Sequence, residues 1–580
     1  MLVLFCARAA ADGDVRTYED GRLDAAVAAA GFQVEPHAEG RRIAFVRLVR
    51  DDVFIDGEPY PTLLNVLHWR TTEGFAKREL LFSIGDVYLQ EVIEETERNL
   101  RERGYFAFVR IVPVKTRDPA EVGVLVHTRD RWSLRLEPEW ETTGGDVNYL
   151  QLDLTERNLF GRANQAVARY RLTPFTHDIG QTYLDRRVFG EELSLSEAFE
   201  ARFNREHGGV EATKGELGLG RPFYTLDDRW SYDARVEYFD GVSRNVKGSG
   251  LATVQDENGD DTGLRPVYDD RWASVLARVS RRRGAHHKQI FTFGAGFKDR
   301  AVVPNAETML EPGREAEFAR RVLPVTRREA FPLARYDVFL PRYEAFQNLT
   351  TYGVTETVRK GPDAGALFTL PLRAFGSSSD AFVAQGWTGY VWAEDQALLD
   401  VHVQGTARLD DGAVVDQRLL AFLRGATPPL GVGRLVLSAR WDARRRDTNK
   451  TPVSLGGDSG LRGHASGAIS EIGGNLALAN LELRTLPLDL DSVQLGAVAF
   501  YDVGTVYLHL AEADLRHDVG LGLRVVFPQI EPLVFRFDFG VPLDGQGFAV
   551  VVGTGLGQPV KLVGDDWDGR VERPPVRFRR

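Results

Sequence analysis

The chain has 580 residues, of which 27% are charged and 43% hydrophobic, and its formal charge is -11. This length exceeds that of one ordinary hydrophobic core, so at least two domains are expected. The acidic balance argues against a general nucleic-acid binder, which is usually basic. The single cysteine, Cys6, excludes an intrachain disulfide and zinc sites built on cysteine pairs. No run of ~18 apolar residues occurs, which argues against membrane-spanning helices and leaves a membrane β-barrel open.

The first residues resemble a secretion signal without a basic start. Residues 1–11 (MLVLFCARAAA) are apolar and then small, and they contain two small-x-small patterns. Because they are short, they predict a truncated signal peptide, with a frayed terminus as the alternative. Residues 12–40 are expected to be a leader or linker.

Residues 41–130 mix helical and extended patterns. A strand is expected at 43–49, a short helix at 62–69, and an amphipathic helix from Leu89 to Leu100 that stops at Gly104. Two further strands are expected at 106–112 and 121–128. The resulting β-α-α-β-β order predicts a small sheet with helices on one face.

From about residue 131 the hydrophobic period changes to two and stays there. One example is the run of Leu435, Leu437, Ala439 and Trp441, which alternates with Ser438, Arg440 and Asp442. Such runs match the ~9–11 residues that a tilted strand needs to cross a bilayer. A soluble sandwich also alternates, but ~420 residues without a helical segment or repeat favour a closed barrel with a polar lumen. The expected fold class is therefore mainly β: a transmembrane antiparallel β-barrel of about 16 strands over 131–555, after a small α+β domain.

The connections between these strands differ in length. Charged segments rich in Gly and Pro, at 242–270, 301–332 and 445–470, are expected to be long outer loops. Three prolines (Pro341, Pro362 and Pro371) make 333–394 ambiguous, so the strand count ranges from 16 to about 20. Residues 556–580 follow the last expected strand as a C-terminal tail.

Five motifs, in order along the chain, carry a resemblance to a known family. They are Asn99 to Phe106 at a helix–strand junction, Glu156 to Arg162 at a strand turn, Gly456 to His464 in a glycine-rich loop, Asn475 to Arg484 in a strand, and Phe500 to Gly504 at the end of the next strand. Together they resemble the BamA/TamA superfamily of outer-membrane proteins, which includes the bacterial surface antigen family. The resemblance implies a POTRA domain at 41–130 and a barrel with one loop folded inward.

The resemblance also implies which residues anchor that loop: Leu461, Arg462, Gly463 and His464. The family usually has an aromatic residue where this chain has His464. If the apolar strand faces meet lipid, Glu482 and Asp502 face the lumen. A guanidinium there gains bidentate, charge-assisted hydrogen bonds from carboxylates. Arg462 is therefore expected to pin the loop to the inner wall.

One alternative and two further motif residues accompany this expectation. The alternative is that Arg462 is a solvated loop residue and that Glu482 pairs with Arg484 or another strand. Phe500 and Gly504 complete the barrel motif next to Asp502.

A lateral seam is expected between the first strand, around 134–141, and the last, around 548–553. Leu136 and Val551 are expected to face each other across it. Gly553 is one of the glycines that would weaken the closing strand.

These features predict a non-enzymatic assembly factor, without a cofactor or metal, in the bacterial outer membrane with its POTRA domain in the periplasm. The POTRA sheet edge would capture clients by strand addition, and the barrel would template them at the seam. The expected partners are unfolded outer-membrane or secreted client proteins, outer-membrane lipid and lipopolysaccharide, and periplasmic accessory subunits, with no nucleic acid. The alternatives are a dedicated two-partner-type secretion pore, a passive surface-antigen barrel without insertase activity, and a soluble β-rich protein with a helical cap.

Competing chemistry has weaker support. Residues 457–460 spell GDSG, the nucleophile motif of trypsin-like proteases, which requires a histidine base and an orienting aspartate. His286 and His287 lie in a basic turn, and adjacent residues on a strand point to opposite faces, so a surface loop is expected there rather than a metal site. Two basic runs, 281–283 and 444–446, are expected at strand ends, where arginine keeps a rim soluble or contacts anionic lipopolysaccharide.

Overall fold

A computed structural model of the chain describes residues 18–56, 61–102, 104–143, 146–254, 260–308, 310–352, 355–490, 493–527, 531–544 and 547–553. The expected leader, 1–11, and the expected tail, 556–580, lie outside the described residues. None of the described helices is long and apolar enough to cross a membrane.

The N-terminal domain is a three-stranded sheet covered by helices, and it contains the expected β-α-α-β-β order. Its elements are α1 (Tyr18–Ala29), β1 (Arg42–Asp51), η2 (Thr62–Leu67), α2 (Glu73–Arg78), α3 (Gln90–Glu102), β2 (Phe106–Lys115) and β3 (Glu121–Asp130). The sheet order is β1-β3-β2, with β1 parallel and β2 antiparallel to β3. In α3, Ile93, Thr96 and Leu100 recur at helical spacing and are buried against the sheet.

Two details of this domain differ from expectation. The expected helix at 62–69 is a 3₁₀ helix over 62–67 with exposed Leu63 and Val66, and the first helix after β1 with buried residues is α2. The range 12–40, expected to be a leader or linker, contains α1. Leu23 and Val27 of α1 are buried in one apolar cluster with Val114 and Leu125 of the sheet. Burying this face gives α1 a place in the folded domain.

The rest of the chain forms a closed antiparallel barrel. Its strands are β4 (Leu134–Thr143), β5 (Asp146–Leu159), β6 (Asn164–Leu172), β7 (Thr176–Asp185), β8 (Ser194–Asn204), β9 (Val210–Arg221), β10 (Trp230–Arg244), β13 (Val267–Arg283), β14 (Lys288–Pro304), β15 (Arg327–Phe339), β16 (Arg342–Gln347), β17 (Thr355–Thr369), β18 (Ala381–Glu394), β19 (Ala397–Asp410), β20 (Ala413–Ala426), β21 (Gly433–Arg445), β24 (Asn475–Thr485), β25 (Leu488–Leu490), β26 (Val493–Tyr507), β27 (Arg516–Phe527), β28 (Glu531–Pro542) and β29 (Ala549–Gly553).

Among the described residues these 22 segments make 20 strands of the barrel wall, here called staves. Two of the staves are interrupted, so that β15 with β16 and β24 with β25 each count as one. The expected count of about 16 is therefore wrong. Pro341 and Pro362 lie where β15 gives way to β16 along β17, between the pairs Phe339↔Asp363 and Arg342↔Lys360. Proline removes a ladder donor, which fits a break in the pairing here, and the register is the same on both sides of the break.

Side chains alternate along the staves between an exposed apolar outside and a buried polar inside. On β24, Leu481 and Leu483 are 45% and 40% exposed, whereas Glu482 between them is 0% exposed. This is the pattern of a barrel with lipid outside and a polar lumen.

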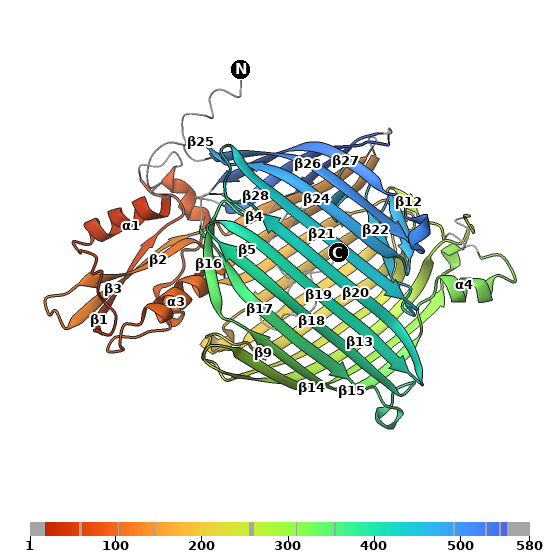
Figure 1. The fold of residues 1–580 in the computed structure, drawn as a ribbon, viewed down its shortest axis with the longest axis horizontal. Coiled ribbons are helices and arrows are strands. Elements are labelled where there is room, and N and C mark those ends of the chain that lie inside the picture. Colours follow the sequence, from red (N-terminus) through yellow and green to blue (C-terminus); the bar gives the residue numbers. More distant parts are fainter. Residues whose placement is uncertain are drawn as a thin grey trace, which may run out of the picture.

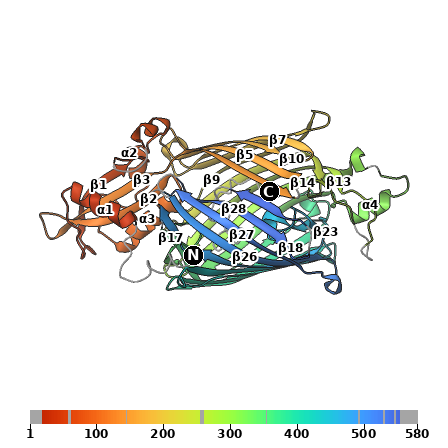
Figure 2. The same cartoon turned by 90° about the horizontal axis from the view of Figure 1, so that it is seen from above.

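The two ends of the barrel are unlike. The N-terminal domain contacts one end, here called the domain end, through turns such as that between β5 and β6, where Thr72 N donates to Gly161 O at 2.9 Å. The opposite, far end carries the long connections (Figure 1, Figure 2), which contain β11 (Val246–Lys247) with β12 (Gly250–Leu251), η4 (Ala306–Thr308) with α4 (Glu315–Arg321), and β22 (Pro452–Leu455), η6 (Gly457–Ser459) and β23 (Ile469–Ile472). The three long loops expected from composition all lie at the far end. The remaining short helices are η3 (Val188–Gly190), η5 (Arg373–Phe375) and η7 (Leu510–Glu512).

Candidate functional site

The connection between β21 and β24, residues 446–474, folds from the far end into the barrel. Its strands β22 and β23 pair with each other, and Leu461 is buried with Val453, Leu455, Leu476 and Val506 in an apolar cluster against β24 and β26. This cluster holds the segment 456–468, here called the inward loop, against the inner wall.

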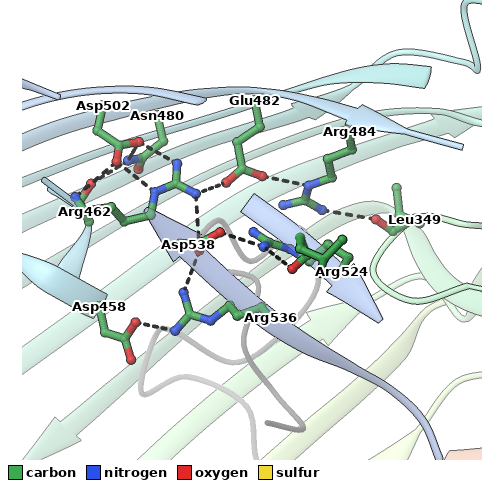
Figure 3. Close-up of polar contacts among 12 residues, drawn as sticks. Leu349, Asp458, Arg462, Asn480, Glu482, Arg484, Asp502, Arg524, Arg536 and Asp538 are labelled. Carbon is green, nitrogen blue, oxygen red and sulfur yellow. Dashed lines mark hydrogen bonds and ion pairs between the residues drawn. The ribbon is translucent and has the colours of Figure 1, made fainter. Parts of the chain in front are cut away.

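Arg462 of the inward loop contacts both carboxylates that the sequence places on the lumen face (Figure 3). Its Nε and Nη2 donate to the two oxygens of Asp502 at 2.8 and 2.7 Å, and its Nη1 donates to Glu482 Oε1 at 2.5 Å. The Arg462 backbone N–H also donates to Asp502, at 3.2 Å. The structure thus brings together the three side chains, and Arg462 is fully buried instead of solvated.

Further groups balance the charge of this buried cluster. Arg484 Nε donates to Glu482 Oε2 at 2.7 Å, and Asn480 Nδ2 donates to Asp502 Oδ1 at 2.7 Å. Two arginines therefore face two carboxylates in a site that water does not reach. Buried ion pairs are stable only when their remaining donors and acceptors are also bonded, and here they are.

Phe500 and Gly504 of the expected barrel motif lie against the connection between β21 and β24. The Arg462 guanidinium carbon lies 3.6 Å from the centre of the Phe500 ring, a cation–π contact on the wall beneath the loop. A Cβ on Gly504 would lie 3.0 Å from the Leu455 side chain and from the Ala477 carbonyl. Glycine at 504 therefore leaves room for the apolar cluster of the inward loop.

Gly463 and His464 join the loop to β27 and β28. Gly463 N donates to Asp518 Oδ2 at 2.6 Å, and His464 Nδ1 lies 2.8 Å from Asp518 Oδ1. A Cβ on Gly463 would lie 2.8 Å from the backbone of β28, and a Cβ on Gly540 would collide with the Arg462 carbonyl. Loop and wall approach this closely because both positions are glycine.

The seam lies where expected, but its residues do not pair as expected. Val551 lies opposite Glu141, whereas Leu136 lies opposite Leu154 of β5 and is 61% exposed. The expected pairing of Leu136 with Val551 is therefore wrong. A sequence locates a closing strand more easily than its register, which depends on how the barrel closes. Gly553 lies opposite Arg536 of β28.

The inward loop also touches the seam, through a residue that the sequence analysis missed. Glu141 of β4 is fully buried and accepts from Ser466 N at 2.7 Å and from Asn148 Nδ2 at 2.7 Å. On the other flank, Asp458 of the loop pairs with Arg536 of β28. The available signal was the alternation itself, which puts Glu141 on the lumen face of its strand.

The competing chemistries find no support in these contacts. Ser459 Oγ donates to the Gly456 carbonyl at 2.6 Å, and the ring of the nearby His464 is directed to Asp518 and Asp544. Within the part of the chain that the structure describes, no group of three or more His, Cys, Asp or Glu side chains is arranged to hold a metal.

Comparisons with known proteins follow the same direction. Among curated proteins, none matches the sequence. Similar solved structures include BamA from Haemophilus ducreyi lacking POTRA domains 1–3 (14% identity, 89% of this chain and 85% of that chain, TM-score 0.37) and CdiB from Acinetobacter baumannii (12%, 90% and 77%, TM-score 0.41). CdiB from Escherichia coli is a third (13%, 89% and 77%, TM-score 0.40). At such identities and TM-scores these structures decide nothing about this chain. Residues 453–550, from the inward loop to the last strand, match the Omp85 superfamily domain, which confirms the resemblance to the BamA/TamA superfamily of outer-membrane proteins.

Proposed function

We propose that this chain is a non-enzymatic assembly factor of the bacterial outer membrane, which receives unfolded client proteins and passes them to lipid through its seam. The Omp85 domain and the barrel fit an outer-membrane location. The POTRA-like N-terminal domain would then lie in the periplasm with the domain end, and the far-end loops would face lipopolysaccharide. Periplasmic accessory subunits are further partners in this proposal.

One observation carries the proposal: within the described residues, β4 pairs over a shorter length with β29 than with β5. Among the described residues 134–143 and 547–553, four residue pairs join β29 to β4, whereas ten join β4 to β5. At about 0.5–1.5 kcal/mol net for each hydrogen bond, with about one bond for each pair, the seam ladder contributes roughly 2–6 kcal/mol. Such a joint can part and accept a client strand, because the client replaces the same backbone hydrogen bonds.

The inward loop braces this joint from the lumen side. It bonds to Glu141 on β4 and to Asp518 on β27, and its Asp458 pairs with Arg536 on β28. The loop thus spans both flanks of the seam while Arg462 fixes it to β24 and β26. We infer that the anchor keeps the two flanks aligned when the seam opens.

Client capture would use β1 of the N-terminal sheet, because the outer edge of β2 is already occupied. Side chains of α3 cover one half of that edge: Glu97 accepts from Ile111 N, and Arg101 Nη2 donates to Val109 O at 3.0 Å. Residues 33–35 cover the other half through Glu35 N to Pro113 O at 3.0 Å and Lys115 N to Gln33 O at 2.8 Å. On the β1 edge, residues 85–86 bond only the start of the strand, through Ile43 N to Asp86 O and Gly85 N to Ile43 O, both at 2.8 Å. Strand addition requires free backbone groups, so it favours the part of β1 after Ile43.

The test is a disulfide that locks the seam in the register of the structure. Thr142 and Val550 are direct partners on β4 and β29, and antiparallel partners lie within the Cα separation that a disulfide spans. Thr142→Cys with Val550→Cys, in a Cys6→Ser background, would lock it. Leu136→Cys with Leu154→Cys is the matched control, because it joins β4 to β5 and leaves the seam free.

The readout is the amount of folded outer-membrane barrels in cells whose only copy of the chain is the variant. Locking the seam should stop their assembly, reduction should restore it, and the control pair should have no effect. Normal assembly with a fully formed seam disulfide would refute the proposal. If cells without the chain lose only one secreted protein, and the seam lock does not affect its secretion, the two-partner-type secretion pore is favoured.

A further inference from the structure

The connection from β15 to β17 is unlike the other domain-end turns. Instead of turning directly, the chain continues as β16, whose six residues pair with residues 355–360 of β17. The pairing of β17 with β18 ends at Gly361↔Val391, so this hairpin extends beyond the registered wall. Figure 1 shows β16 at the domain end, beside the N-terminal domain. The hairpin consists of residues 342–360, of which 342–352 and 355–360 are described.

The apolar face of the hairpin lies on the inner wall. Phe346, Leu349 and Val358 are 0, 1 and 6% exposed, in one cluster with residues of four further staves. Those wall residues are Val391, Ala393, Leu398, Ala426 and Val436, and Val391, Leu398 and Val436 each lie next to an exposed apolar residue on the lipid side. An apolar patch on the face that is otherwise polar makes sense where a hairpin covers it.

The tip of the hairpin reaches staves far from its own. Tyr352 is 4% exposed and is buried with Val526 of β27 and Val534 of β28. A Cβ on Gly496 of β26 would collide with the Tyr352 hydroxyl, so glycine makes room for it. The hairpin therefore leaves the barrel at β15 and β17, follows the inner face of β18 to β21, and ends against β26 to β28. It crosses the lumen at the domain end.

Two buried arginines latch the tip to the wall. Arg434 Nη2 donates to Gln347 O at 3.0 Å. Arg484 Nη1 donates to Leu349 O at 3.2 Å (Figure 3). Arg484 is the same side chain that bonds Glu482 of the loop anchor. On the outer side, the Arg98 guanidinium of α3 lies 3.9 Å from the centre of the Tyr343 ring, so the N-terminal domain touches the hairpin too.

We infer that the hairpin described over residues 342–352 and 355–360 is a plug that closes the domain end of the lumen and can swing out about the breaks at Leu340-Pro341 and Gly361-Pro362. Its contacts with the wall are two apolar clusters and hydrogen bonds between its backbone and the side chains of Arg434, Arg484 and Gln396, and its own β-ladder is internal. It can therefore leave the wall without breaking the barrel. Hinged movements use a few element-terminal residues in this way. This inference does not depend on the proposed client.

The direct test is conductance in planar lipid bilayers, with the full chain in a Cys6→Ser background. Phe339 and Asp363 are register partners, so deleting 342–360 leaves a four-residue turn on an intact β15–β17 ladder. The deletion should raise single-channel conductance severalfold. Conversely, Tyr352→Cys and Gly496→Cys, joined by a short bis-maleimide in place of the tyrosine ring, should hold the channel in its lowest state. A folded deletion variant that conducts like the parent would overturn the inference.

A point variant covers the case in which the deletion does not fold. Arg434→Ala removes one latch, and Arg440→Ala is its matched control, because Arg440 lies on the same strand and contacts Asp442 instead of the hairpin. Ala393→Cys, which lies under the hairpin at 3% exposure, reports opening through its reaction with a maleimide. Labelling should be severalfold faster with Arg434→Ala than with Arg440→Ala, and equal rates would exclude a movable plug.

Discussion

Replacing Arg462 with alanine should release the inward loop while the barrel stays folded. The change removes three charge-assisted hydrogen bonds, of 2.8, 2.7 and 2.5 Å, to two carboxylates that are fully buried. Removing one partner of a buried ion pair typically costs about 3–5 kcal/mol. Once the loop leaves, water can reach Glu482 and Asp502, so the lower end of this range, about 3 kcal/mol, applies. Since 1.4 kcal/mol is about a factor of ten, loop opening should become about a hundredfold more frequent.

Amide hydrogen exchange over residues 457–468 measures this opening directly. The amides of Gly463 and Ser466 are protected by carboxylates of the wall, Asp518 and Glu141, and they exchange only when the loop opens. Arg462→Lys keeps the charge without the bidentate fork and should give an intermediate rate. Arg373→Ala, at an exposed ion pair on the far end, is the matched control and should change nothing. If exchange in Arg462→Ala is as slow as in the parent, the anchor lies elsewhere and the reasoning fails.

Three further changes test other parts of the structure. Asp51 is partly buried, and hydrogen bonds from His127 and Arg22 overcome that burial and lower its pKa from 3.8 to about 2. Because the pKa of Asp51 is lower in the folded chain, its ionised form stabilises the fold above about pH 4, and this stabilisation is lost as the pH falls towards 2. Asp51→Asn should therefore lower the unfolding free energy of the N-terminal domain by about 2 kcal/mol at neutral pH and by progressively less in acid, as measured by urea unfolding of the full chain. An equal cost at every pH would contradict this account. Gly540→Ala should displace the loop as Arg462→Ala does, because its methyl group meets the Arg462 carbonyl, and unchanged exchange over 457–468 would argue against the close approach. Glu482→Gln should speed exchange in both the loop and the hairpin tip, and an effect on the loop alone would separate the two.

The sequence predicts which face of a strand a side chain lies on, but it does not predict which residues of neighbouring strands or loops lie opposite it. Glu482 and Asp502 follow from strand alternation, since each sits between outward apolar residues, and the Gly-flanked Arg462 could be matched to them by charge. Asp518 obeys the same alternation, but nothing in the sequence says that a loop 55 residues away in the chain reaches it. The Leu136–Val551 pair failed for the same reason. The alternation of side chains between two faces is a local property of a strand. The strand register and the wall residues that a loop contacts are set by the closed barrel.

The hairpin is a second feature whose three-dimensional contacts the sequence does not predict. Pro341 and Pro362 were interpreted as interruptions of uncertain strands, and they do interrupt the wall. What the sequence conceals is that the segment between them keeps a strand pattern because it pairs with itself and buries its apolar face inside the lumen. An inward apolar face on β18 to β21 contradicts the polar-lumen rule, and only the three-dimensional partner explains it.

Glu482 links the two closures of the barrel. Its Oε1 accepts from Arg462 of the inward loop, and its Oε2 accepts from Arg484, which holds the hairpin tip at Leu349. If Arg462 leaves, Glu482 still has Arg484, so loop release by itself removes no latch from the hairpin. If the carboxylate is lost, both guanidinium groups lose a charged acceptor at once. Glu482 therefore connects the far-end loop to the domain-end hairpin: losing Arg462 leaves Arg484 paired, whereas losing the carboxylate weakens the hold on both.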